Sequence, residues 1–183
     1  VLRDWSSDVC SSDLGARVER LAAGLALLGV ARQANVGLYG PNCPAWYMGE
    51  YAVHFCAGVT VPLYDTLGEA SVAFICGQTE MGIVFAAADR AKVLLRLKGA
   101  EETSAQLSSR RTIVLMDEPG AETQREIDAA ASKLDVSIVP FAQLEEDGAK
   151  EEARQKLKAV DPVRADELFT LCYTSGTTGA PKG

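Results

Sequence analysis

The chain has 183 residues, and 48% of them are hydrophobic, so it can bury the core of one domain or of part of a larger one. Its formal net charge of -7 comes from 25 acidic and 18 basic residues, the opposite of the basic surface that nucleic-acid binding requires. We therefore expect no nucleic-acid partner, and the longest apolar stretches are shorter than the roughly 18 to 20 residues of a membrane-spanning helix.

Residues 1–14 show neither helical nor strand periodicity, and they repeat Ser-Ser-Asp on both sides of Cys10. Residues 4–14 resemble the in-frame translation of a sequencing adapter. We therefore interpret 1–14 as a non-native leader that carries no chemistry and exclude it from the fold. A genuine disordered acidic tail is the alternative.

An amphipathic helix is expected from residue 16, because apolar residues recur at spacings of three and four from Val18 to Leu28. Gly29 is placed to end this helix. Residues 35–39 then form the first expected strand, which a Gly-Pro-Asn break follows. Pro44 suits the first turn of the next helix, where its missing N–H would have no intrahelical partner.

Strand-like and helix-like runs alternate as far as residue 158. Further strands are expected at 59–64, 82–87, 112–117 and 136–141, and helices at 45–57, 69–77, 89–97, 122–133 and 144–158. This alternation predicts an α/β fold with a mostly parallel sheet. Residues 161–164 break the pattern, and we expect 167–173 to be a last strand that leads into the C-terminal run. That run would then lie at a strand end, where open α/β sheets bind ligands.

His54 is the only histidine, so a catalytic triad or a His-rich metal site would have to be built on it. It lies in the apolar helical run expected at 45–57. We therefore interpret it as a packed or surface side chain, and we name no catalytic residue and no metal ligand.

The C-terminal run, YTSGTTGAPKG at 173–183, combines glycines, hydroxyl side chains and one cation. The glycines let main-chain N–H groups approach phosphate oxygens, the hydroxyls donate further hydrogen bonds, and the lysine offsets negative charge. This composition predicts a polyphosphate site. Its candidate ligands are Thr174, Ser175, Gly176, Thr177, Thr178, Gly179 and Lys182.

The Walker A loop, GxxxxGK[ST], is the first alternative for a phosphate-binding run. It needs Gly directly before its Lys and Ser or Thr directly after it. Here Lys182 lies between Pro181 and Gly183, which excludes that form and with it the ordinary P-loop hydrolases and kinases. A Gly/Thr-rich surface turn is the other alternative, and we reject it because the whole run matches a known pattern after an expected strand.

YTSGTTGAPKG resembles the phosphate-binding signature of the adenylate-forming superfamily, which includes acyl-CoA synthetases, luciferases and peptide-synthetase adenylation domains. Residues 35–85 resemble long-chain fatty acyl-CoA synthetases of eukaryotic type, most clearly in VPLYDTLG at 61–68, and the likeness runs from about Ala16 to Gly183. The positions in this stretch that match the family are interpreted as a strand end and a turn; they are Pro62, Tyr64, Asp65, Thr66 and Gly68.

The resemblance implies that 15–183 is an incomplete N-terminal AMP-binding domain, the first part of the large domain of such enzymes, with the C-terminal domain absent. A long-chain fatty acid would attack the α-phosphate of ATP, and the thiol of coenzyme A would then displace AMP. By resemblance, the candidate ligands named above would hold the β- and γ-phosphates and share with Mg²⁺ the charge of departing pyrophosphate. We expect the chain alone to be inactive.

The resemblance further implies an intracellular, membrane-associated parent enzyme at the cytosolic face of the endoplasmic reticulum or of the peroxisome. Two other functions stay open: a ligase of the same superfamily for another acid, and a non-catalytic nucleotide-binding module. Extending the reading frame past Gly183 would separate them, because a ligase needs the family's Mg²⁺-binding Glu and C-terminal Lys.

Overall fold

One sheet of five parallel strands organises the computed structural model, which describes residues 9–64, 67–107, 111–174 and 181–183. The strand order is β2-β1-β3-β4-β5. The strands are β1 (Asn35–Tyr39), β2 (Val59–Leu63), β3 (Ile83–Ala86), β4 (Arg111–Leu115) and β5 (Val136–Pro140). The α/β class and the parallel sheet are thus confirmed.

Seven helices connect or flank the strands in the described part of the chain. They are α1 (Val9–Leu27), α2 (Pro44–Phe55), α3 (Glu69–Thr79), α4 (Ala88–Gly99), α5 (Ala121–Lys133), α6 (Phe141–Gly148) and α7 (Glu151–Lys158). A short 3-10 turn, Ser104–Gln106, follows α4. None of the described helices is both long and apolar enough to cross a membrane.

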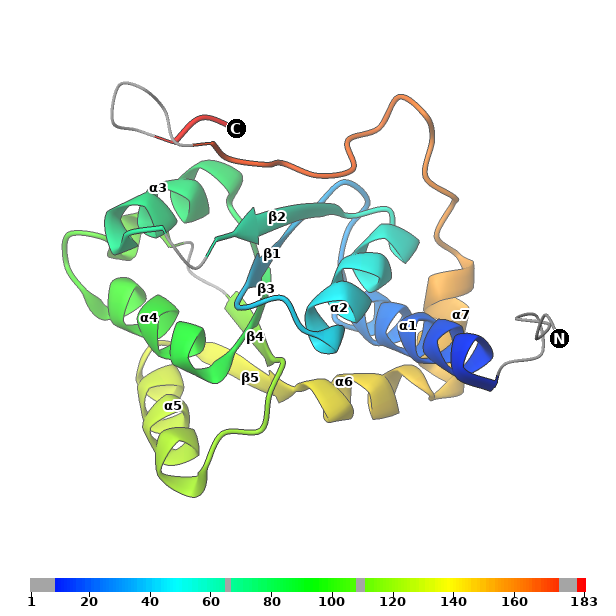
Figure 1. The fold of residues 1–183 in the computed structure, drawn as a ribbon, viewed down its shortest axis with the longest axis horizontal. Helices are drawn as coiled ribbons and strands as arrows, with labels where there is room; N and C mark the ends of the chain where they lie inside the picture. Colours follow the sequence, from blue (N-terminus) through cyan, green and yellow to red (C-terminus); the bar gives the residue numbers. More distant parts are fainter. Residues whose placement is uncertain (1–8, 65–66, 108–110, 175–180) are drawn as a thin grey trace, which may run out of the picture.

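The strand order reverses direction at β1, and this reversal distributes the helices over two faces. From β1 the chain moves to β2 through α2, whereas every later crossover moves the other way. Because parallel crossovers are right-handed, α2 lies on the opposite face from α3, α4 and α5. Helices α1 and α6 join α2 on its face (Figure 1). A reversal of this kind opens a crevice at the carboxyl ends of the strands.

Each face of the sheet has its own apolar core, because successive strand residues point to opposite faces. Val84 belongs to the core under α3, α4 and α5, together with Leu63 and Ile113. Phe85, the next residue, belongs to the core under α1, α2 and α6, together with Leu38. All five side chains are almost completely buried.

Helix α1 begins earlier than its expected start at residue 16. It begins at Val9 and therefore includes residues 9–14, for which no regular structure was expected. Neither proline nor glycine occurs between Val9 and Leu14, so nothing in the backbone stops the helix there. The non-native origin of 1–14 stays a prediction, and residues 1–8 lie outside the described ranges. Gly29 adopts a positive φ of 83° after the helix end, as its position predicted.

The single helix expected at 144–158 is two helices, α6 and α7, which Ala149 and Lys150 separate. Gly148 ends α6 where that helix touches α1, because a Cβ atom there would lie 1.7 Å from the carbonyl oxygen of Arg20. Helices α6 and α1 approach each other through this glycine. The break after it lets α7 turn and pack on α1 as well.

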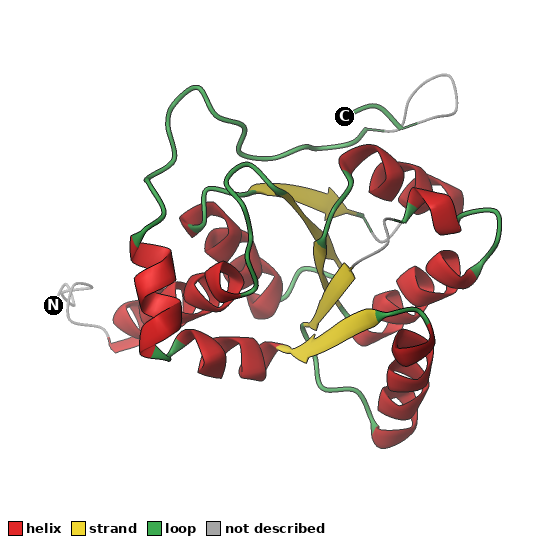
Figure 2. Cartoon of the chain, turned by 180° about the vertical axis from the view of Figure 1, so that it is seen from behind, coloured by secondary structure: helices red, strands yellow, loops and turns green. Residues whose placement is uncertain are grey.

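The expected strand at 167–173 is not a strand. Residues 161–174, here called the connecting segment, turn at 165–167 and then run along the free side of β2 (Figures 1 and 2), and their one described bridge to it joins Thr170 and Thr60. The next bond along β2 on that side would need the N–H of Pro62, which proline lacks. The ladder therefore stops after the N–H of Leu171 donates to the Thr60 carbonyl at 2.8 Å.

Candidate phosphate-binding site

The two ends of the predicted phosphate loop meet at an antiparallel backbone pair. The N–H of Thr174 donates to the carbonyl of Lys182 at 2.8 Å, and the N–H of Lys182 donates back to the carbonyl of Thr174 at 3.1 Å. The Thr174 hydroxyl also lies 3.3 Å from the Lys182 carbonyl oxygen. We call this pair, with Tyr173 and Gly183, the loop root.

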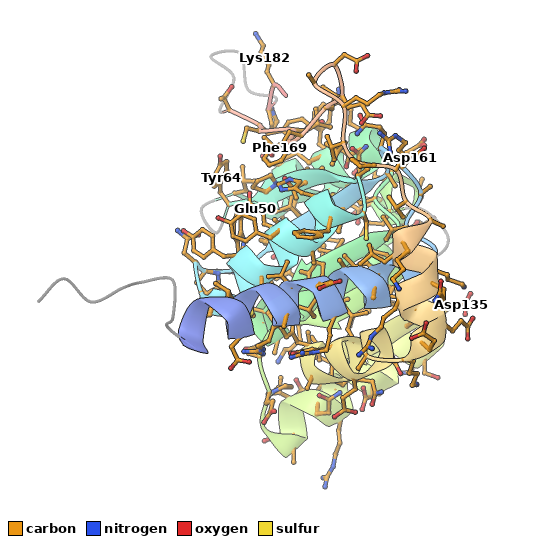
Figure 3. The ribbon with its side chains drawn as sticks, turned by 90° about the vertical axis from the view of Figure 1, so that its right-hand side faces the viewer. Glu50, Tyr64, Asp135, Asp161, Phe169 and Lys182 are labelled. Carbon is orange, nitrogen blue, oxygen red and sulfur yellow. The ribbon has the colours of Figure 1, made fainter. Side chains whose placement is uncertain are left out.

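Only part of the predicted site can be placed. Of the candidate ligands, Thr174 and Lys182 lie in the loop root, and both are exposed. The Lys182 side chain points away from the sheet (Figure 3) and makes no ion pair with another described residue. The candidates outside the described residues are Ser175, Gly176, Thr177, Thr178 and Gly179. An exposed ammonium beside an exposed hydroxyl is a donor set that suits a polyphosphate.

Tyr173 fixes the loop root to the body of the protein. Its side chain is 5% exposed, belongs to the core under α3, and donates a hydrogen bond to Gln78 Oε1 at 3.0 Å. Burial raises the pKa of this phenol. Gly183 packs on the ring, because a Cβ atom there would lie 2.7 Å from Tyr173 Cζ. No sequence pattern pointed to Gln78, which lies far from the loop along the chain.

Arg32, in the turn between α1 and β1, clamps the start of the connecting segment. Its Nε and Nη2 atoms each donate to the Glu167 carboxylate at 2.7 Å. Its guanidinium also donates to the carbonyl oxygens of Asp161 and Pro162, at 2.7 and 2.9 Å. The hydrogen bonds from Arg32 and from the Arg164 N–H hold the pKa of Glu167 below its usual range.

Gln33 binds the next part of the connecting segment through both the oxygen and the nitrogen of its side-chain amide. Its Oε1 accepts the N–H of Leu168 at 3.0 Å, and its Nε2 donates to the carbonyl of Leu168 at 3.1 Å. Gln33 itself adopts a positive φ of 59°. A side-chain amide in this position imitates a neighbouring strand, which explains how the segment stays extended without a longer ladder.

An open groove of about 630 Å³ lies beside the segment at the carboxyl ends of β1 and β2. Glu50 of α2 and Tyr64 after β2 both line it, and both are labelled in Figure 3. Burial raises the pKa of Glu50, and a hydrogen bond with Cys172 raises the pKa of Tyr64. Of the other family-like turn residues, Asp65 and Thr66 lie outside the described residues.

Of the residues that the structure describes, those that suit an anion are Thr174 and Lys182 at the loop root. Among the described residues, no three His, Cys, Asp or Glu side chains come together in a way that could hold a metal ion.

Comparison with known proteins gives a family and several relatives. The model of the family described as AMP-binding enzyme matches residues 10–183. Long chain acyl-CoA synthetase 7, peroxisomal, from Arabidopsis thaliana is 34% identical over 167 residues, which are 90% of this chain and 22% of that protein. Long-chain-fatty-acid–CoA ligase 1 from Cavia porcellus is 34% identical over 166 residues, 87% of this chain and 22% of that protein. The chain thus spans less than a quarter of these relatives.

Solved structures share the fold. The adenylation domain of a carboxylate reductase from Mycobacterium chelonae gives a TM-score of 0.75 at 22% identity, over 93% of this chain and 26% of that one. A fatty acyl CoA synthetase from Mycobacterium tuberculosis gives a TM-score of 0.64 at 21% identity, over 94% of this chain and 28% of that one.

Proposed function

Because the chain belongs to the AMP-binding enzyme family, we propose that it is part of an acid–thiol ligase that activates a long-chain fatty acid as an acyl-adenylate and transfers it to coenzyme A. The names of the curated relatives support this substrate class. The proposal assigns the complete reaction to a protein longer than these 183 residues, because the chain covers 22% of the relatives' length.

The observation that carries the proposal is the backbone pair between Thr174 and Lys182. It closes the Gly/Thr-rich run into a loop beside the carboxyl end of β2, and it leaves the Lys182 ammonium exposed. A run of glycines, hydroxyl side chains and one cation has the chemistry that stabilises a polyphosphate.

In the first step, the fatty-acid carboxylate attacks the α-phosphorus of ATP, a new P–O bond forms, and the bond to the β-phosphate oxygen breaks. Negative charge builds up on the departing pyrophosphate. We assign Lys182, the Thr174 hydroxyl and the loop between them to the β- and γ-phosphates, where they would offset this charge. Mg²⁺, when bound to the phosphates, would supply further positive charge.

In the second step, the coenzyme A thiolate attacks the acyl carbonyl carbon and AMP leaves. We assign no residue of this chain to that step. Peroxisomal names among the relatives support a location at the peroxisome, and the resemblance to this family supports either that membrane or the endoplasmic reticulum. Fluorescence microscopy of the tagged protein checks this assignment.

The test is acyl-CoA formation by the product of the extended reading frame, with palmitate, acetate, coumarate and amino acids compared at equal concentration. We expect palmitate to react fastest. Lys182→Ala should reduce palmitate-dependent exchange of pyrophosphate into ATP by about 100-fold, the effect typical of removing one preorganised group that stabilises developing charge.

The matched control is Lys133→Ala, which removes an exposed ammonium at the end of α5, far from the loop root (Figure 1). Its exchange rate should equal that of the unmodified enzyme. Faster reaction with a different acid would replace the long-chain assignment by another ligase. If no acid gives an adenylate, the result would favour a non-catalytic nucleotide-binding module.

A further inference from the structure

His54, at the end of α2, touches the connecting segment just before the loop root. Its ring stacks on Phe169 with centroids 3.5 Å apart and an interplanar angle of 25°. Its Nε2 atom lies 3.1 Å from the Phe169 carbonyl oxygen. Because a carbonyl only accepts, this distance assigns the proton of the neutral ring to Nε2.

The Phe169 carbonyl is the point where β2 and α2 hold the segment together. Besides His54, the N–H of Thr60 donates to it at 3.2 Å, and the Thr60 hydroxyl lies 3.4 Å away. The hydroxyl is also 3.3 Å from His54 Nε2. The bridge at Thr60 is the one described backbone pairing between the segment and the sheet, so contacts made here fix where the segment crosses β2.

The other ring nitrogen of His54 is in a different position. Nδ1 is buried and has no hydrogen-bond partner among the residues that the structure describes. In the neutral ring Nδ1 carries a lone pair that accepts no hydrogen bond from the described residues. Protonation would place an N–H there and a positive charge shared over the ring, with nothing at this buried nitrogen to accept the proton.

His54 also shares a groove with charged groups of α1 and α7, and among these Arg20 is paired with Glu145 at 2.6 Å. His54 and its neighbour Phe55 line a groove of about 850 Å³ between α1, α7 and the connecting segment. The groups that share this groove are Glu19 and Arg20 from α1 and Arg154 and Lys158 from α7. Three of these four are cationic. On the histidine's own helix, Glu50 lies one turn earlier, and burial raises the pKa of that carboxyl.

We propose that His54 is a positioning residue that holds the root of the phosphate loop on the sheet when its ring is neutral and releases it when the ring is protonated. The idea rests on the proposed role of residues 173–183 as the pyrophosphate-holding loop. Phe169 lies only a few residues before Thr174, so the docking at β2 and the Tyr173 anchor together set where this end of the loop root lies.

The direction of the pH effect follows from burial. Desolvation lowers the pKa of His54 below its ordinary value of 6.5, and the hydrogen bond to Phe169 offsets this in part. The docked segment therefore binds a proton less well than the released one. Docking is complete above about pH 6.5 and weakens as the pH falls through the lowered pKa.

The first measurement is NMR titration of the chain, in which the single histidine gives one imidazole signal. We expect a pKa below 6.5 and the Nε2–H tautomer. Amide hydrogen exchange of Thr60 and Leu171, corrected for intrinsic rates, should show protection that drops several-fold between pH 7.5 and 5. The amide of Val59, bonded to the Ala34 carbonyl within the sheet, is the internal control and should not change.

Three variants separate a positioning role from a merely structural one. His54→Gln keeps an N–H donor near the Phe169 carbonyl and cannot titrate, so protection should stay high and become independent of pH in this range. His54→Phe keeps the stack without the donor and should lower protection at every pH. His54→Ala should lower it further. A wild-type pKa of 6.5 or above, or identical pH profiles for the wild type and His54→Gln, overturns the inference.

Pyrophosphate titration, measured as the ratio of wild-type to His54→Gln affinity at each pH, links the docking to the loop. The ratio cancels protonation of the ligand itself. We expect it to fall several-fold from pH 7.5 to 5.5. Exchange profiles that respond to pH while neither protein binds pyrophosphate would contradict the proposed function and retain the positioning role. Amide exchange that does not respond to pH, together with normal pyrophosphate binding, would contradict the positioning role and retain the proposed function.

Discussion

The central strands are sealed by apolar side chains, whereas the connecting segment is held mainly by polar contacts. Strand β3 has four residues and all are buried. The segment, by contrast, is held by the backbone bridge at Thr60 and by one guanidinium, one amide and one imidazole, from Arg32, Gln33 and His54. The free energy gained by burying apolar side chains is proportional to the buried area and does not depend on pH. Each polar contact, in contrast, can be broken by one substitution or by one proton.

This difference separates two kinds of stability. The sheet should open only when the whole domain unfolds, while the segment should detach locally with a much smaller free energy. The loop root belongs to both regions, because Tyr173 lies in the core and Thr174 does not. Substitutions that affect one region and leave the other unchanged can test the distinction.

The largest effect is expected in the core. Phe85→Ala removes a fully buried ring that packs edge-on against Phe141 at a centroid distance of 6.2 Å. We expect a loss of about 3–5 kcal/mol in the free energy of unfolding, measured by urea denaturation. Phe55→Ala, at a ring that is 57% exposed, should change it by less than about 0.5 kcal/mol. Equal losses would remove the distinction between core and surface.

A local effect is expected from Glu167→Gln, which removes the charge that Arg32 holds at two points. Exchange of the Leu171 amide should become several-fold faster, while the urea midpoint of the domain stays nearly unchanged. Asp166→Asn, at a neighbouring carboxylate that is 82% exposed, is the control and should leave both unchanged. A large shift of the urea midpoint would show that the segment and the sheet unfold together.

Acid provides the same change without a substitution. Arg32 lowers the pKa of Glu167 from its ordinary 4.5, so the contribution of this carboxylate is present above pH 4.5 and is lost as the pH falls through the lowered value. In the His54→Gln chain, protection of the Leu171 amide should therefore stay flat down to about pH 4.5 and fall only below it. Protection that falls between pH 7 and 5 in this chain would refute the assignment.

The smallest effect concerns the loop root. Tyr173→Phe removes only the hydrogen bond to Gln78, and we expect a local change of about 1 kcal/mol or less. Exchange of the Lys182 amide, which is bonded to the Thr174 carbonyl, should become a few-fold faster. Tyr51→Phe, at a side chain that is 52% exposed, should have no effect. An unchanged Lys182 amide would show that ring packing alone fixes the root.

Much of the sheet was predictable because its periodicities are local. Alternation of apolar runs predicted β1, β2 and β3 to within a residue or two, and Pro44 and Gly29 marked helix ends correctly. The break between α6 and α7 was missed, since the close approach of Gly148 to α1 involves residues distant in sequence. Pro62 was a usable signal for the short ladder at 167–173, because proline lacks the N–H that the ladder would need. Which side of β2 that missing N–H faces could be judged only once β1 was placed.

The candidate ligands could be named from the sequence, whereas the contacts that hold the connecting segment and the loop root could not. The Gly/Thr/Lys run named the candidate ligands, and their role stays a prediction; the structure places two of them, Thr174 and Lys182, in one backbone pair. Arg32, Gln33 and His54 reach the segment from more than a hundred residues away, and no spacing in a single sequence encodes such contacts. His54 was expected to be packed or at the surface, and it is half-buried against Phe169.

Calorimetric titration of the 183-residue chain with pyrophosphate tests the central claim most directly. The wild type and Lys133→Ala should bind with equal affinity, and Lys182→Ala should bind at least about tenfold more weakly, as expected when a charge-assisted hydrogen bond is lost. Equal affinity of all three proteins, or no binding by the wild type at millimolar pyrophosphate, would contradict the assignment of residues 173–183 to the phosphates.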